Sequence, residues 1–289
     1  MGSSKKFGSW EQAVDWLRNQ PSQTDLVLGA YYDDPLLYSA DRYWKSDEWH
    51  SIKTFIRGVT GSALDIGAGR GIASYALAKD GFQVTALEPD ASDIVGAGAI
   101  RKLSLDSGLA IKVVEEFSER LPFEDCSFDF IFARAVLHHT SNLQIACSEI
   151  FRVLKPGGRF IAAREHVLSK QGDLGSFLAS HPLHSLYGGE NAFLLSQYVD
   201  ALIKAGFNIK AVLGPLESAI NYAPRTHVEL VSEFSKRITR KIPCLKKITI
   251  SILSHLFIWR IVSRFASWLD NRPGRLYSFV AIRPVSYIP

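Results

Sequence analysis

Residues 64–71, which read LDIGAGRG, decide the fold of this sequence. A short apolar run ends there in three glycines at alternating positions, Gly67, Gly69 and Gly71. Glycine adopts backbone conformations that other residues avoid, and it lets the atoms of a ligand come close to the main chain. Such a pattern is typical of a buried strand that turns into a helix at a binding site. The segment therefore predicts the first strand and the binding turn of an open α/β sheet.

Short apolar runs and amphipathic segments alternate along the chain after this turn. Such alternation predicts a mostly parallel sheet with helices on both faces. We expect strands at residues 63–66, 82–87, 110–114, 128–133, 159–163, 207–212 and 276–282. We expect helices at residues 10–19, 72–79, 91–105, 143–154 and 194–205, a helical region at 35–58, and a long loop at 167–191.

The composition is that of an ordinary soluble globular protein. The chain has 289 residues, of which 47% are hydrophobic and 21% are charged, so it can bury a core without disulfides or metals. Its three cysteines are spaced too widely for a disulfide framework or a zinc motif, which favours a reducing compartment. No apolar segment follows the polar N-terminus as it would in a secretory signal. We therefore expect a cytoplasmic protein, with a peripheral membrane contact as an open alternative.

The residues around the turn narrow the class of ligand. The dinucleotide fingerprint requires a third glycine or alanine at the position of Ile72, and no P-loop motif occurs. Asp65 would repel a pyrophosphate but suits a cationic ligand. Glu88 follows Gly67 by 21 residues, at the end of the second expected strand, where its carboxylate can accept hydrogen bonds from two ribose hydroxyls. Together these residues predict a site for an adenosyl group.

Four ordered segments carry a resemblance to a known family, and they cover about residues 60–165. They are residues 64–71, 86–89, 121–129 and 149–159. Together they resemble the class I S-adenosylmethionine-dependent methyltransferases, and more narrowly the small-molecule branch called type 11. The resemblance implies a Rossmann-like, doubly wound sheet of seven strands with an antiparallel last strand. It also implies S-adenosyl-L-methionine as cofactor and S-adenosyl-L-homocysteine as product.

The resemblance implies roles for residues along the predicted edge of the sheet. Gly67 and Gly69 would face the methionine part, Asp65 its amino group, Glu88 the ribose and Pro89 the adenine. Phe117 stands where the family has an acid for the adenine amino group, so Ser118 is expected to contribute hydrogen bonds and Phe117 to pack on the ring. The cofactor-binding residues expected in this way are Asp65, Gly67, Ala68, Gly69, Glu88, Pro89, Phe117, Ser118 and Ala133.

The resemblance also implies a division of the chain into four regions. Helices that precede the first strand form a lid in similar enzymes, which suggests this role for the aromatic-rich N-terminal region. We expect a helical lid at residues 1–60, the methyltransferase core at 61–216, a basic helical insertion at 217–275, and the last strand with the C-terminus at 276–289.

Methyl transfer to oxygen needs alignment of the reactants and a group that takes up the hydroxyl proton. His138 follows the fourth expected strand and is the first candidate for this base, because an imidazole titrates near neutral pH. The alternative is that His138 caps the next helix or binds the backbone. Glu165 follows the fifth strand, where it can orient a substrate hydroxyl or a histidine.

Residues 181–191 concentrate polar chemistry in the expected long loop, which suggests a substrate site. His181 and His184 join His138 and Glu165 as catalytic candidates. These two histidines could hold a metal together with Glu190 and Glu165, but their spacing matches no metal motif, so no metal is expected. The residues expected to bind the substrate are Tyr32, Tyr43, Arg134, Tyr187, Glu190 and Asn191.

Positive charge is concentrated near the C-terminus. Residues 234–289 hold eleven Lys or Arg and one Asp, a net charge of +10, which leaves −6 for the rest of a chain whose net charge is +4. Residues 248–259 are uncharged, but this run is shorter than the roughly 20 residues of a membrane-spanning helix. An interfacial helix, a homodimer contact and a cover for the substrate cavity all remain possible. No nucleic-acid-binding module is visible, so no such partner is expected.

These observations favour O-methylation of a small or lipid-linked molecule. Residues 181–191 also loosely resemble methyltransferases of bacterial glycan clusters, and this resemblance implies a sugar or polysaccharide precursor as the preferred acceptor. A methyltransferase acting on a hydrophobic acceptor such as a quinone, polyketide or lipid is the first alternative. A cofactor-binding protein without catalysis is the second.

Overall fold

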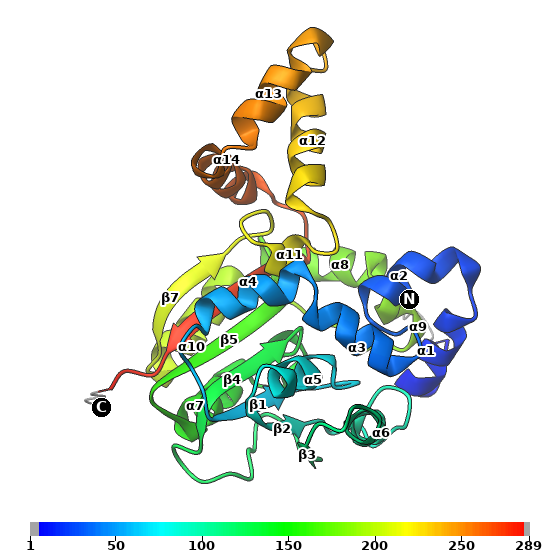
Figure 1. Ribbon diagram of the computed structural model, residues 1–289, viewed down its shortest axis with the longest axis vertical. Helices are drawn as coiled ribbons and strands as arrows, with labels where there is room; N and C mark the ends of the chain where they lie inside the picture. Colours follow the sequence, from blue (N-terminus) through cyan, green and yellow to red (C-terminus); the bar gives the residue numbers. More distant parts are fainter. Residues whose placement is uncertain (1–5, 286–289) are drawn as a thin grey trace.

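A mixed sheet organises the computed structural model, which describes residues 6–285 apart from the side chain of residue 243. The strand order is β3-β2-β1-β4-β5-β8-β7, and β8 runs antiparallel to both of its neighbours (Figure 1). A two-residue strand, β6, pairs with the end of β5. The strands are β1 Ser62–Ile66, β2 Gln83–Leu87, β3 Ile111–Val114, β4 Phe128–Arg134, β5 Leu154–Leu168, β6 Phe193–Leu194, β7 Asn208–Leu213 and β8 Arg275–Ile282. The predicted Rossmann-like architecture is confirmed.

The register of the parallel strands brings their carboxyl ends to one edge. Ile66 at the end of β1 lies opposite Leu87 on β2 and Ala133 on β4, and Ala133 in turn lies opposite Ala162 on β5. Each strand end is followed by a segment in which the sequence predicts site residues. The edge therefore gathers side chains that are up to about a hundred positions apart in the sequence.

Helices cover both faces of the sheet, as Figure 1 shows. One face packs against α3, α4, α5 and α6, with Trp49, Ile52 and Leu77 fully buried. The other packs against α7 and α10 through Ile150 and Leu202. These helices are α3 Leu36–Trp44, α4 Asp47–Phe55, α5 Ile72–Lys79, α6 Ala97–Ser107, α7 Leu143–Val153 and α10 Leu195–Ala205.

Two expectations about the elements were wrong. The loop expected at 167–191 contains the helices α8 Leu174–Ser180 and α9 Pro182–Leu186, and β5 continues through its first residues. Helix α6 begins at residue 97, not at 91. The Asp90 side chain accepts a hydrogen bond from the Ser92 amide at 2.8 Å, and this local turn competes with helix formation.

The chain before β1 forms two further helices, α1 Trp10–Arg18 and α2 Thr24–Gly29. Ser9 caps α1 as the sequence predicts, since its side chain accepts a hydrogen bond from the Gln12 amide. The assignment of residues 1–60 as a lid stays a prediction.

Four helices connect β7 to β8, and three of them project away from the sheet in Figure 1. They are α11 Ala219–Tyr222, α12 His227–Ile238, α13 Lys246–Leu253 and α14 Leu256–Leu269. Leu230, Val231, Leu253 and Trp259 form a small core of their own inside this projection. Within residues 6–285, no single helix is long and apolar enough to cross a membrane; α13 and α14 reach that length only together, and a 94° bend separates them.

Candidate active site

A cavity of about 750 Å³ lies at the carboxyl edge of β1, β2, β4 and β5. The glycine turn and Glu88 line one part of it, and histidines with Glu190 line another. Residues of the N-terminal region, among them Trp10, Leu26 and Tyr32, complete the wall. A single cavity therefore contains both groups of side chains that the sequence singled out.

The glycine turn requires glycine for two measurable reasons. Gly67, Gly69 and Gly71 have φ angles of 60°, 55° and 82°, in the left-handed region that side chains disfavour. In addition, a Cβ atom on Gly67 would lie 2.6 Å from a methyl group of Val136, on the segment after β4. This close approach places the turn directly against the chain that leads to His138.

Two buried carboxylates flank the turn. The Ser74 hydroxyl donates to Asp65 Oδ2 at 2.6 Å, and burial raises the pKa of Asp65 to about 7. Glu88 accepts from the Gly69 amide at 2.7 Å and from the Asp90 amide at 3.0 Å, and burial raises its pKa as well. A nearby cation would offset the cost of burying either negative charge. The turn is therefore better suited to a positively charged ligand than to a phosphate.

The other residues predicted for the cofactor side divide into two groups. Ala68, Pro89, Phe117 and Ser118 line the cavity. Ala133 does not line it, because this residue is fully buried within β4 between β1 and β5. The expected role of Ala133 in cofactor binding is therefore wrong. Arg134, Ala135 and Val136, which follow it, line the cavity instead.

Arg70, inside the glycine turn, ties the N-terminal segment to the cavity. Its Nη1 donates to the carbonyls of Tyr31 at 3.0 Å and Asp33 at 2.9 Å, and its Nη2 pairs with Asp34. Tyr31 and Tyr32 line the cavity beside it. The sequence analysis missed this role of Arg70, because nothing in the turn itself indicates which distant backbone the side chain reaches.

Tyr43 does not line the cavity, which corrects its expected role in substrate binding. It is fully buried in α3, its ring centroid lies 5.7 Å from that of Trp49, and its hydroxyl donates to Glu48 at 3.3 Å. Aromatic residues at helical spacing usually belong to the core, and this one does.

Arg134 lines the cavity with a guanidinium that is already paired. Nε and Nη2 donate to the two carboxylate oxygens of Glu48 at 2.6 and 3.0 Å, and the Glu48 side chain is 1% exposed. A bidentate, buried pair of this kind fixes the orientation of the arginine. Glu48 has no distinguishing motif in the sequence, so the pair could not be foreseen.

Glu165 holds the segment after β4 in place. Its carboxylate accepts hydrogen bonds from the amides of Val136, Leu137 and His138 at 3.2, 3.1 and 3.0 Å. His138 Nδ1 donates to the same carboxylate at 2.7 Å. Burial raises the pKa of Glu165, and the three amide donors act in the opposite direction. Of the two roles considered from the sequence, the geometry supports orientation of a histidine.

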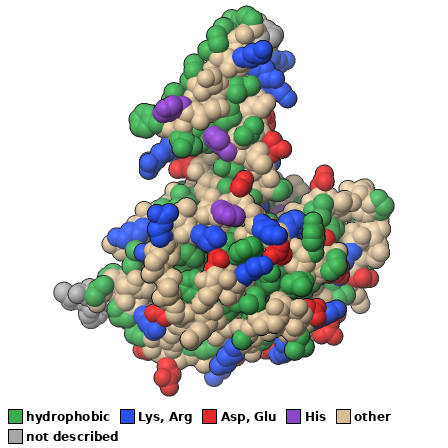
Figure 2. Space-filling model, viewed as in Figure 1, with side chains coloured by type: hydrophobic (Ala, Val, Ile, Leu, Met, Phe, Trp, Pro, Cys, Tyr) green, Lys and Arg blue, Asp and Glu red, His purple; other side chains and the backbone are tan. Residues whose placement is uncertain are grey.

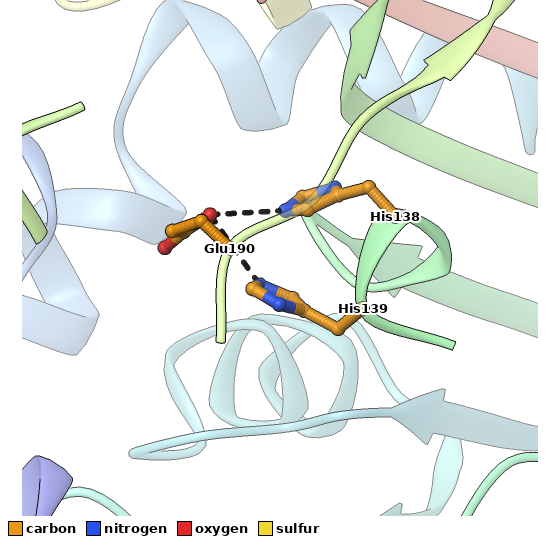
Figure 3. A group of neighbouring side chains, drawn as sticks. All are labelled: His138, His139 and Glu190. Carbon is orange, nitrogen blue, oxygen red and sulfur yellow. Dashed lines mark ion pairs between the residues drawn. The ribbon is translucent and has the colours of Figure 1, made fainter. Parts of the chain in front are cut away.

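Four imidazoles and one carboxylate lie together beyond Glu165. His138 and His139 point toward Glu190, with Nε2–Oε2 distances of 3.7 and 3.9 Å (Figure 3). His181 Nδ1 lies 3.8 Å from the other Glu190 oxygen, and the His166 ring lies between those of His138 and His181. Burial lowers the pKa of His138 well below its ordinary value, that of His166 to about 3 and that of His181 to about 4. These three imidazoles are therefore neutral near pH 7.

Only some of the residues predicted from the loop at 181–191 line the cavity. Tyr187 and Glu190 line the cavity together with His181, whereas His184 and Asn191 do not. His184 lies within α9 and does not line the cavity, so its predicted catalytic role is not supported by its position. His139 and His166, which the sequence analysis did not select, do line the cavity. Their positions next to His138 and Glu165 in the sequence were the available signal.

We predict that Glu165→Ala lowers the free energy of unfolding by about 3–5 kcal/mol, because it leaves several buried N–H donors without an acceptor. Denaturant unfolding of the purified variant measures this change. The exposed Glu124→Ala is the control and is expected to stay within about 0.5 kcal/mol of the parent. A loss below about 1 kcal/mol for Glu165→Ala would contradict the assigned role.

Comparison with known proteins shows that part of this chain is similar to a known family. A protein-family model described as "Methyltransferase domain" matches residues 64–162. The ubiquinone/menaquinone biosynthesis C-methyltransferase of Brucella anthropi is 37% identical over 105 residues, which cover 35% of this chain and 39% of that protein. The sarcosine/dimethylglycine N-methyltransferase of Aphanothece halophytica is 34% identical over 142 residues, 47% of this chain and 49% of that protein. The chain thus matches half or less of the length of these curated relatives.

Solved structures share the fold at low sequence identity. A structure from Galdieria sulphuraria, described as a sarcosine dimethylglycine methyltransferase, aligns with a TM-score of 0.57 at 16% identity, covering 96% of this chain and 100% of that one. Phosphoethanolamine N-methyltransferase 2 of Haemonchus contortus, bound to S-adenosylhomocysteine, aligns with a TM-score of 0.53 at 21% identity, covering 96% and 61%. The glycine turn and its two acids, Asp65 and Glu88, lie within the matched segment, so residues 64–162 are similar to a methyltransferase domain and the chain has the fold of class I S-adenosylmethionine-dependent methyltransferases.

Proposed function

We propose that this chain transfers a methyl group from S-adenosyl-L-methionine to a hydroxyl oxygen of a small, polar acceptor. The observation that carries this proposal is the single cavity that joins the acidic glycine turn to the cluster of neutral imidazoles. One end suits a cationic nucleoside cofactor, and the other offers nitrogen lone pairs to an acceptor hydroxyl. The relatives named above act on carbon and nitrogen, so the choice of oxygen rests on the cavity of this chain.

The residues at the turn fit S-adenosyl-L-methionine. Gly67 and Gly69 leave the backbone uncovered, Asp65 is placed to face a positively charged group, and Glu88 keeps lone pairs for ribose hydroxyls beyond its two backbone bonds. When bound, the cofactor supplies an electrophilic methyl group on a positively charged sulfur. S-Adenosyl-L-homocysteine is the expected product.

The polar end of the cavity would orient the acceptor. His138 donates Nδ1–H to Glu165, which leaves its Nε2 lone pair directed into the cavity, so this atom is available to a hydroxyl proton. Trp10, Tyr32 and Tyr187 line the same cavity, with the Tyr32 and Tyr187 ring centroids 5.9 and 6.0 Å from that of Trp10. A polar cluster bordered by flat aromatic walls suits a molecule with several hydroxyls, such as a sugar, better than a long hydrocarbon.

The N-terminal region would restrict the access of bulk solvent to the cavity. Its aromatic side chains cover the cavity, and Arg70 holds them there through two backbone carbonyls and Asp34. Removal of water strengthens the electrostatic interactions within the site. The lid role predicted for residues 1–60 is consistent with this placement and belongs to the proposal.

We predict that Glu88→Ala weakens S-adenosyl-L-methionine at least about tenfold, because it removes a carboxylate that contacts the ribose and supports Gly69. Calorimetry of cofactor binding measures the change, and Glu115→Ala, on an exposed pair outside the cavity, is the control with expected parental affinity. Product formation across a panel of sugars, quinones and amines then identifies the acceptor class. Unchanged affinity in Glu88→Ala would overturn the cofactor assignment, and methylation of amines alone would overturn the choice of oxygen.

We also predict that cofactor affinity rises with pH between about pH 6 and pH 8. The unliganded pKa of Asp65 is about 7, so below this value a cationic ligand must displace a proton from the carboxyl group. Above it the carboxylate is already charged, and the affinity levels off. Asp65→Asn is expected to bind more weakly and to lose this pH dependence, while the exposed Asp106→Asn retains it. A slope that is the same in Asp65→Asn as in the parent would show that another group titrates.

A further inference from the structure

Glu190 and its neighbouring imidazoles form an arrangement that hydrogen bonds do not explain. The ligand atoms of His138, His139 and Glu190 all lie within 4.8 Å of one another, and the same holds for His166, His181 and Glu190. The Glu190 side chain is 9% exposed, and its Oε2 has no hydrogen-bond partner. His181 Nδ1 is buried without a partner as well. Buried polar atoms of this kind cost free energy unless a ligand satisfies them.

The outer hydrogen bonds fix which nitrogen of each ring is free. His138 Nδ1 donates to Glu165 at 2.7 Å, His139 Nδ1 to the Gly189 carbonyl at 2.9 Å, and His166 Nδ1 to the Gly274 carbonyl at 2.8 Å. A carbonyl can only accept, so the proton of a neutral ring must be on Nδ1. In His138 and His139 the Nε2 lone pair then faces the lone pairs of the Glu190 carboxylate. A cation between the Nε2 atoms and the carboxylate oxygens would interact favourably with the lone pairs of both.

This pattern is the one that metal-binding histidines show. Their second nitrogen donates to a carboxylate or a backbone carbonyl, which fixes the ring orientation and the tautomer. The Nε2–Oε2 distances of 3.7 and 3.9 Å are too long for hydrogen bonds. They are slightly longer than the separation of about 3.3 Å between two ligands that each lie about 2.0 Å from a tetrahedral zinc ion. A small inward movement of the side chains would complete the coordination.

We propose that His138 Nε2, His139 Nε2 and the Glu190 carboxylate bind one divalent transition-metal ion, for which Zn²⁺ is the probe. Imidazole and carboxylate together suit zinc and its neighbours. Three protein ligands leave a position open toward the cavity, as in catalytic zinc sites. The sequence analysis expected no metal, because it considered His181 with His184 and could not see that the fold brings His138 and His139 to Glu190.

The role of the ion rests on the proposed function. A hydroxyl oxygen bound at the open position would keep the electron pair of its O–H bond as the proton leaves to water, and the ion stabilises the resulting alkoxide. His138 would then act as a ligand, and the ion would lower the pKa of the acceptor. Metal binding itself does not depend on this role and is tested separately.

Calorimetric titration of the chelator-treated full chain with zinc chloride tests the proposal. One equivalent is expected to bind, and Glu190→Gln and His139→Ala are each expected to weaken binding at least about tenfold. His50→Ala, an exposed histidine on α4 outside the cavity, is the matched control and is expected to bind like the parent. Absence of binding, or equal affinity in Glu190→Gln and the parent, would overturn the metal site.

Cofactor affinity separates this proposal from the proposed function. Both metal-site variants are expected to bind S-adenosyl-L-methionine as the parent does, because neither residue belongs to the glycine turn. If zinc binding fails while cofactor binding persists, the metal site is wrong and the methyltransferase assignment remains. If cofactor binding fails in the parent while zinc still binds, the reverse conclusion holds.

A second, independent observation concerns the projecting helices α13 and α14. On α14 the buried positions include Ser263 and Ser267, whereas Phe257, Ile261, Phe265 and Trp268 are 57–74% exposed. Trp259 is buried together with these serines, but the helix exposes several large apolar side chains as well, which is unusual for a surface helix. The neighbouring positions Ile248 and Ile252 of α13 and Leu256 of α14 are exposed as well.

Basic residues accompany this apolar face. Residues 239–269 contain six Lys or Arg and no Asp or Glu. Figure 2 shows apolar and basic side chains together on the projecting part of the molecule. Helices with exposed Phe, Trp and Ile next to Lys and Arg bind the interface of anionic membranes. We propose that α13 and α14 dock this chain on an anionic lipid surface, where a lipid-linked acceptor would be available.

Co-sedimentation of the full chain with vesicles tests the docking. Binding is expected with vesicles that contain phosphatidylglycerol, to weaken with salt, and to be weak with phosphatidylcholine alone. The combined change Phe257→Ser, Phe265→Ser and Trp268→Ser is expected to lower binding at least about tenfold. Leu105→Ser, at an 82% exposed position on α6, is the control and is expected to bind as the parent does. Absence of binding to the vesicles that contain phosphatidylglycerol would overturn the proposal. It would also be overturned if the triple change converted a dimer of this chain to monomers and left the amount that sediments with vesicles unchanged.

Discussion

A single buried carboxylate, Glu165, determines the shape of the candidate active site. It accepts three consecutive backbone amides and one imidazole, and no part of its side chain is exposed. The turn after β4 has no regular partner for these amides, so the carboxylate replaces the hydrogen bonds that a strand or helix would provide. This arrangement presses Val136 against Gly67 and turns His138 toward the cavity. The cofactor side and the acceptor side are therefore fixed by one group.

Charge is distributed between the two ends of the cavity according to their tasks. The glycine turn has the buried acids Asp65 and Glu88, which favour a positively charged ligand. The far end holds imidazoles that burial keeps neutral, arranged around the carboxylate of Glu190. Arg134, which lies between them, is neutralised by Glu48. A molecule at the far end of the cavity thus meets imidazole nitrogens and the Glu190 carboxylate, and this is the environment on which the proposed O-methylation depends.

The sequence predicted most of the fold and about half of the site, and the difference has a physical reason. Strands and helices near β1 follow from local patterns, so their positions agree with the prediction to within a few residues except for α6 and β5. The glycine turn and Glu88 were found because their function depends on spacing along the chain. The pairs Glu48–Arg134, Arg70–Tyr31 and His139–Glu190 join residues 39 to 86 positions apart, and only the packed structure reveals them. Tyr43 was misassigned because a core tyrosine and a cavity tyrosine have the same helical spacing.

The connection between β7 and β8 is much longer than the sheet requires. Antiparallel neighbours need only a turn of about two residues between them, yet here residues 214–274 intervene. Because this segment leaves and re-enters at the rim of the sheet, its length and surface can change without altering the register of β1, β2 and β4. The first part of this segment is tied to the cavity, because Pro224 lines it and Arg164 donates to the carbonyls of Ile220 and Ala223. Helices α12 to α14 do not line it, so under the proposed docking their surface can change independently of the cavity. Exchange of α12 to α14 alone would then replace the proposed docking surface and keep every residue that lines the cavity.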